Sequence, residues 1–103
     1  MKTTVTEIDA YVLDTLMADL VGHDRRPSAF LVYLAIWAAG SGGRAALSYA
    51  DLAARTGLSR RAAQSAVALL QRRELIAVER GGPTDTPRYR PLTPWRRWAS
   101  AEG

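Results

Sequence analysis

The sequence lacks the residue types on which most enzyme and metal sites depend. Its 103 residues include no cysteine and only one histidine, His23. Without cysteine there is no disulfide framework, no thiolate metal site and no thiol nucleophile, and His23 has no evident catalytic companion. The spacing of its histidine and carboxylate residues matches no metal-ligand pattern. We therefore expect no catalytic residues, no metal site and no cofactor.

Long hydrophobic runs are also missing. No segment reaches about 18 consecutive apolar residues, the length that a membrane-spanning helix needs. The first 24 residues are acidic, so they do not have the basic start of a signal peptide. These absences, together with the lack of cysteine, predict a cytoplasmic protein that has no membrane partner.

Charge is distributed unevenly along the chain. Residues 1–24 carry one lysine and five acidic residues, a net charge of −4. Residues 25–103 carry thirteen arginines and five acidic residues, a net charge of +8. The length suits a single domain with a modest core. The basic part is therefore the candidate for binding a polyanionic partner.

Two helices are predicted in the first 40 residues. Apolar residues recur with helical spacing from Thr6 to about Val21, and the acidic side chains of this segment form a solvated face. Pro27 opens a second helix, Ser28 to Ala39, which is apolar nearly all round and ends at the glycine-rich residues 40–43. This second helix is the expected centre of the core.

The middle of the chain predicts a short strand and two capped helices. The strand covers Arg44 to Leu47. Ser48 then caps a short helix, with Asp51 three residues later as in a capping box. Gly57 ends that helix, and Ser59 caps a longer one that runs to about Arg73.

The last third predicts a β-hairpin followed by a tail. Residues 75–80 and 88–92 are short extended runs, and the turn-rich residues 81–87 separate them. In the tail, Trp95 and Trp98 either form a helical turn packed on the body or fray. The chain is thus divided into an N-terminal helix (1–26), a central domain (27–92) and a basic tail (93–103). The fold class is mainly α with a small β-hairpin, in the order of a winged helix-turn-helix.

Residues 47–76, LSYADLAARTGLSRRAAQSAVALLQRRELI, resemble the DNA-binding core of MarR-like, GntR-like and related bacterial winged-helix regulators. Leu52-Ala53 match the positioning helix of that family, residues 56–59 match its turn, and Leu75-Ile76 match the entry to its wing. Glu74 departs from the pattern, because the family often has glycine there. The resemblance implies a recognition helix at about 59–73 and a wing at about 76–92.

The predicted recognition helix has a basic, polar outer stripe and an unusual start. Arg60 and Arg61 occupy its first turn, where the helix dipole favours anions. A phosphate would resolve that conflict, so Arg60 is the expected phosphate anchor. Arg61 and Gln64 are the expected base readers, because arginine pairs with guanine and glutamine with adenine. The candidate DNA-binding residues are Ser48, Tyr49, Ser59, Arg60, Arg61, Gln64, Ser65, Arg72, Arg80, Arg88 and Arg90.

These features favour a sequence-specific transcriptional regulator that binds double-stranded DNA and has no catalytic activity. The wide apolar side of the N-terminal helix adds the expectation of a homodimer. Two alternatives stay open: a winged-helix adaptor that binds proteins, and a plasmid or phage replication or partition factor. The sequence leaves open whether a small-molecule effector exists.

Overall fold

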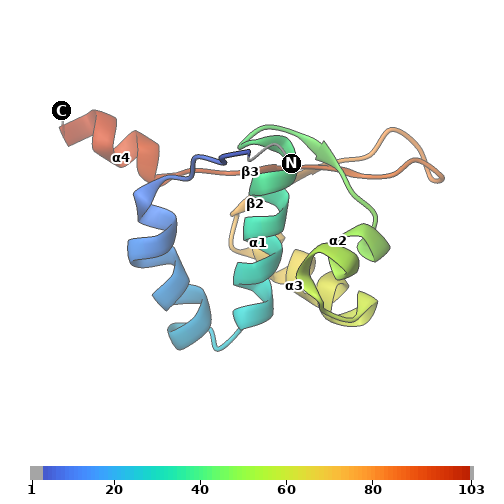
Figure 1. The fold of residues 1–103 in the computed structure, drawn as a ribbon. Coiled ribbons are helices and arrows are strands. Elements are labelled where there is room, and N and C mark those ends of the chain that lie inside the picture. Colours follow the sequence, from blue (N-terminus) through green and yellow to red (C-terminus); the bar gives the residue numbers. More distant parts are fainter. Residues whose placement is uncertain (1–3, 103) are drawn as a thin grey trace.

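The computed structural model describes residues 4–102 and the surroundings of side chains 4–98. In this part of the chain, five helices and a three-stranded sheet contribute to one hydrophobic core (Figure 1). The predicted class, mainly α with a small β-sheet and the order of a winged helix-turn-helix, is confirmed. Among the described residues, no helix combines the length and the apolar character needed to cross a membrane.

Helix α1 (Pro27–Gly40) is the central element. Pro27 stands in its first turn, where a missing N–H costs no hydrogen bond, and Ser41 ends it in the left-handed conformation with φ of 50°. None of its 14 residues is charged. Tyr33 and Ile36 are fully buried and lie in the common core, as predicted for this helix. The Tyr33 hydroxyl donates to the backbone oxygen of Leu92 over 3.1 Å.

The N-terminal helix covers residues 10–23 and starts four residues later than the predicted Thr6. It contains two π-helical segments, η1 (Val12–Leu16) and η2 (Asp19–His23). In a helix that started at residue 6, the Glu7 carbonyl oxygen would accept a hydrogen bond from the backbone N–H four residues later. Here that oxygen instead accepts a hydrogen bond from Trp37 Nε1 at 2.8 Å, so the segment before residue 10 stays non-helical.

The sheet has the order β1-β3-β2 and is antiparallel throughout. Strand β1 is Ala45–Ala46, β2 is Ile76–Glu79 and β3 is Arg88–Pro91. The predicted hairpin is present, with Val78 opposite Tyr89. Along β3, Tyr89 is buried and the arginines on either side of it are exposed, so the inner face of the sheet closes the core.

Helix α4 (Trp95–Glu102) places the start of the tail against the body, which decides between the two predicted alternatives. Trp95 is buried and stacks on Tyr11, with ring centroids 4.6 Å apart. Trp98 meets the edge of Tyr11 and stays more than half exposed. In Figure 1, α4 lies at one end of the molecule, whereas the α2–α3 pair and the tip of the hairpin lie toward the other.

Candidate nucleic-acid interface

Helix α2 (Tyr49–Thr56) and the turn after it are fixed by local hydrogen bonds. The Ser48 hydroxyl accepts from the Asp51 N–H at 3.0 Å, and the Asp51 carboxylate accepts from the Ser48 N–H at 2.9 Å. The hydrogen bond from the Ser48 N–H is the first cause that lowers the pKa of Asp51. Gly57 ends the helix with φ of 79°, a conformation that glycine adopts without strain. The predicted capping box and glycine turn are both confirmed.

Helix α3 (Arg60–Arg72) follows directly and presents two different faces. The Ser59 hydroxyl caps it by accepting from the Ala62 N–H at 3.0 Å. The inward face consists of small and branched apolar residues that are buried: Ala63, Ala66, Val67 and Leu70. This face packs on α1 and α2, so the orientation of the opposite face is set by the core.

The first turn of α3 holds two exposed arginines, Arg60 and Arg61. Helix α3 has no acidic residue, and across residues 4–98 no carboxylate forms an ion pair with either arginine. The first backbone N–H groups of a helix have no acceptor within it and add a partial positive charge. The start of α3 is therefore suited to receive an anion from outside the molecule.

The outward stripe of α3 continues the candidate interface beyond the first turn. Gln64, Ala68 and Arg72 are exposed, and Ser65 is half-buried. These positions share one side of the helix, one to three turns from Arg61. The stripe thus runs from two arginines through small residues to a third arginine.

A second group of candidate residues, Tyr49 at the start of α2 and Arg80 at the start of the hairpin loop, lies near Tyr89 of β3. Tyr89 is fully buried. Burial is the largest cause that raises its pKa to about 12, and the nearby Tyr49 is the second. The charge of Arg80 is close enough to oppose that rise. Within the described part of the chain the Tyr89 hydroxyl has no hydrogen-bond partner. Tyr49 and Arg80, 31 residues apart in sequence, therefore both lie near the Tyr89 hydroxyl.

A third group lies on the outer face of the sheet. Arg88 and Arg90 are exposed there, with Arg88 opposite Glu79 and Arg90 opposite Ala77. Arg44 joins them and forms an ion pair with Glu79 at 3.3 Å. The sequence reasoning missed Arg44. Its place as the first residue of the predicted strand of residues 44–47 was the available signal, because that strand pairs with β3.

The C-terminal end of α3 differs from its start, because its arginine is already bound. Arg73 caps the helix and forms ion pairs with Asp19, at 2.6 Å, and with Asp24. The bond to Asp19 is the first cause that raises the Arg73 pKa. The Asp24 pKa is lowered, first by His23 and then by Arg73. The prediction of a merely solvated acidic face on the N-terminal helix is thus wrong for Asp19.

Asp19, His23 and Asp24 also bring three potential ligand atoms within 4.8 Å of one another. The Arg73 guanidinium already supplies a cation to both carboxylates, so this cluster is an arginine-binding site within the fold. A comparable arrangement occurs at Asp9, which accepts from Trp95 Nε1 and from Arg96 Nε, each at 2.8 Å. The Arg96 bonds are the first cause that lowers the pKa of Asp9. Asp9 also is not part of a free solvated face.

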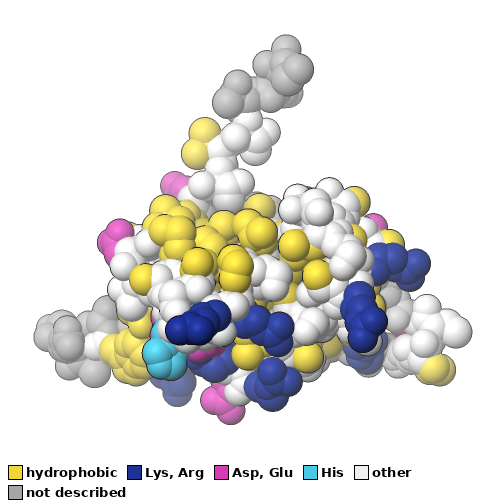
Figure 2. Space-filling view, turned by 90° about the horizontal axis from the view of Figure 1, so that it is seen from below, with side chains coloured by type: hydrophobic (Ala, Val, Ile, Leu, Met, Phe, Trp, Pro, Cys, Tyr) yellow, Lys and Arg dark blue, Asp and Glu magenta, His cyan; other side chains and the backbone are white. Residues whose placement is uncertain are grey.

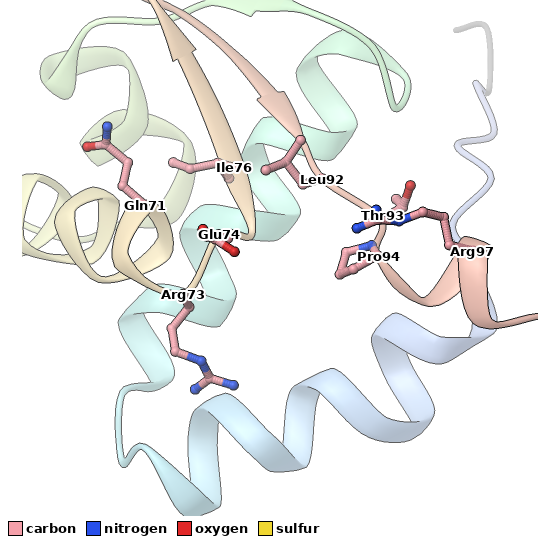
Figure 3. A pocket seen from close by; sticks show the side chains of 8 residues that line it. All are labelled: Gln71, Arg73, Glu74, Ile76, Leu92, Thr93, Pro94 and Arg97. Carbon is pink, nitrogen blue, oxygen red and sulfur yellow. The ribbon is translucent and has the colours of Figure 1, made fainter.

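A groove of about 450 Å³ lies beside the exit of α3, where β2 begins and the segment before α4 passes (Figure 3). Figure 3 shows the Arg73 side chain leaving its rim toward the N-terminal helix. Glu74, on the same rim, has φ of 55°, in the left-handed region that favours glycine. MarR-like and GntR-like regulators often have glycine at this position. The structure gives the reason, because the exit from α3 requires a positive φ there.

The region that contains these elements matches a known family. Residues 26–76 match a family model described as a helix-turn-helix domain. The match begins one residue before α1, includes α2, the Gly57 turn and α3, and ends at the first residue of β2. It supports a helix-turn-helix DNA-binding domain, with DNA as the partner. No curated protein and no solved structure gave a significant match.

Proposed function

We propose that this protein is a cytoplasmic transcriptional regulator that binds double-stranded DNA in a sequence-specific manner. Helix α3 enters the major groove, and the hairpin of residues 76–92 contacts the backbone or the minor groove. The first turn of α3 carries the proposal. Arg60 and Arg61 are exposed there, are not paired with any described acidic side chain, and stand at a capped helix start.

The residues of α3 divide the work between affinity and specificity. Arg60 binds a phosphate together with the free N–H groups of the first turn. Arg61 and Gln64 reach base edges, and the small side chains of Ser65 and Ala68 let the helix backbone come close to the groove floor. Arg72, three turns from Arg61, meets a phosphate farther along the strand.

The other candidate residues flank that helix. Ser48 and Tyr49 at the start of α2, with Arg80 where the hairpin loop begins, contact the backbone beside the groove. Arg88 and Arg90 add positive charge along the hairpin itself. The likeness of residues 47–76 to MarR-like and GntR-like regulators supports the regulatory role.

The test is selection of binding duplexes from a random pool, followed by fluorescence-anisotropy titration at about 50 mM salt. Arg61→Ala combined with Gln64→Ala should relax the selected sequence, because these side chains discriminate bases. Arg60→Ala should weaken all duplexes alike. Absence of binding by the wild type, or equal binding and selectivity of the double variant, would contradict the proposal and favour a protein-binding adaptor.

A promoter reporter carrying the selected site separates regulation from replication. A regulator changes transcription from that promoter, and Arg61→Ala plus Gln64→Ala removes the change. A replication or partition factor would leave transcription unaltered and would instead change the copy number or inheritance of a plasmid carrying the site.

A further inference from the structure

The N-terminal helix exposes a row of large apolar side chains that the fold does not use. Leu13, Met17 and Val21 are 47%, 41% and 39% exposed, although Val12, Leu16 and Leu20 of the same helix already supply its buried side. The exposed residues follow one another at intervals of four, so they form one ridge along the helix. A helix with only a solvated role would carry polar residues there.

Helix α1 extends this apolar surface. It packs beside η2 and carries no charged residue, and its Leu31 side chain is 41% exposed. Figure 2 shows hydrophobic side chains gathered in a broad area over the N-terminal helix and α1, with arginines along its edge. Contiguous apolar areas of this kind mark interaction surfaces on soluble proteins. The surface formed by Leu13, Met17, Val21 and Leu31 is called the apolar ridge below.

The charges around the apolar ridge indicate what covers it. Asp9, Asp19 and Asp24 are satisfied by Arg96 and Arg73 within the chain. The charged side chains that remain exposed are acidic near the start of the N-terminal helix, at Glu7 and Asp14. They are basic after its end, at Arg25. Two such helices in antiparallel contact bring unlike ends together, whereas parallel contact brings like ends together. Their helix dipoles also oppose one another.

We propose that the apolar ridge is the interface between two copies of this chain, related by a twofold axis near Met17. Each copy contributes an antiparallel pair of helices, and the two pairs pack as a four-helix arrangement. In such a symmetric interface Met17 contacts Met17 of the second copy, and Leu13 contacts its Val21. The proposal does not depend on DNA binding.

The experiment is sedimentation equilibrium of the full chain at about 100 µM, a concentration that populates dimers with micromolar dissociation constants. The wild type should have twice the chain mass of 11.2 kDa. Met17→Glu should have the single-chain mass, because the apposed carboxylates repel one another. Thr15→Glu is the matched control: Thr15 is exposed on the same helix but outside the ridge, so this variant should stay dimeric.

A charge-exchange mixture then tests the position of the axis. Met17→Glu and Met17→Lys should each sediment as single chains, and their equimolar mixture should recover the double mass because unlike charges meet. If either variant does not fold by circular dichroism, Leu31→Glu replaces Met17→Glu and should sediment as a single chain. A wild type of single-chain mass, or dimers formed equally by Met17→Glu and Thr15→Glu, would overturn the proposal.

Discussion

The two ends of α3 carry similar arginines in opposite situations. At the start, Arg60 and Arg61 are exposed and form no ion pair with the described side chains. At the end, Arg73 is held by Asp19 and Asp24 of the N-terminal helix. Net charge alone does not distinguish these arginines. The partners do: one end of the helix is tied to the fold, and the other is open to an external anion.

The backbone follows the same division. At the start, Gly57 takes a positive φ with no strain, the Thr56 hydroxyl accepts from the Leu58 N–H, and the Ser59 hydroxyl caps α3. At the end, Glu74 takes a positive φ that costs a non-glycine residue about 1 kcal/mol. The end of the helix therefore accepts some strain, which the Arg73 ion pairs help to offset.

The largest expected effect comes from removing both arginines at the start of α3. Arg60→Ala combined with Arg61→Ala should lower DNA affinity by about 2–4 kcal/mol, roughly 30- to 1,000-fold, through the loss of one phosphate and one base contact. Thermal unfolding should be unchanged or slightly improved, because the helix dipole opposes these charges. Anisotropy titration and circular dichroism measure the two effects. A loss of stability equal to the loss of affinity would show a structural role instead.

Removing the arginine at the other end should have the reverse profile. Arg73→Ala should lower the free energy of unfolding by about 1 kcal/mol, a value reduced by the partial exposure of the pair. DNA affinity should change less than twofold. Urea unfolding measures the first effect, with Arg72→Ala as a matched control because Arg72 is exposed and in no described ion pair. Equal destabilisation by Arg73→Ala and Arg72→Ala would contradict a stabilising role of the Arg73 ion pairs.

Acid should weaken the ion pairs at the same end of α3. The resulting loss in the free energy of unfolding should be smaller than that caused by Arg73→Ala. The folded-state pKa of Asp24 is lowered, so its contribution to stability is present above the unfolded pKa near 3.8 and is lost as pH falls through the folded value. Below pH 4 the stability of the wild type should fall more steeply than that of Asp24→Asn. Urea midpoints between pH 2.5 and 7 measure this. Asp14→Asn, which alters an exposed carboxylate outside the described ion pairs, should follow the wild type.

The smallest effect concerns the backbone at the two ends. Glu74→Gly should raise the free energy of unfolding by about 0.5 kcal/mol, because relief of the positive φ slightly exceeds the extra chain entropy of glycine. Gly57→Ala should lower it by about 1 kcal/mol, although no atom lies within 4 Å of the added Cβ. Denaturant unfolding compares the pair. Destabilisation by Glu74→Gly would mean that the Glu74 side chain makes a needed contact.

The parts of the fold that depend on neighbouring residues were predictable from the sequence. The Ser48–Asp51 capping box, the Gly57 turn and the Ser59 cap are local hydrogen-bond patterns, and all three are present. The inward face of α3 follows from helical periodicity and is buried as predicted. The candidate DNA-binding residues around it were also placed by local pattern, and their contacts with DNA remain predictions.

The parts that failed depend on partners far along the chain. Asp19 meets Arg73 across 54 residues and Asp9 meets Trp95 across 86, so no local pattern shows that these acids are engaged. The late start of the N-terminal helix has the same origin. The Glu7 carbonyl oxygen accepts a hydrogen bond from Trp37, which lies 30 residues farther along the chain. That Tyr49 and Arg80 both lie near Tyr89 likewise appears only in the folded structure, because the three residues belong to separate elements.

The most direct test of the central claim is the salt dependence of DNA affinity for two single variants. Arg60→Ala removes a free arginine at the start of α3, and Arg97→Ala removes an exposed arginine of α4 at the opposite end of the molecule. The slope of log affinity against log salt should become shallower by about 0.9 for Arg60→Ala, the loss of one phosphate contact, and should stay at the wild-type value for Arg97→Ala. An unchanged slope for Arg60→Ala, or equal changes for the two variants, would contradict an anion-binding role for the first turn of α3.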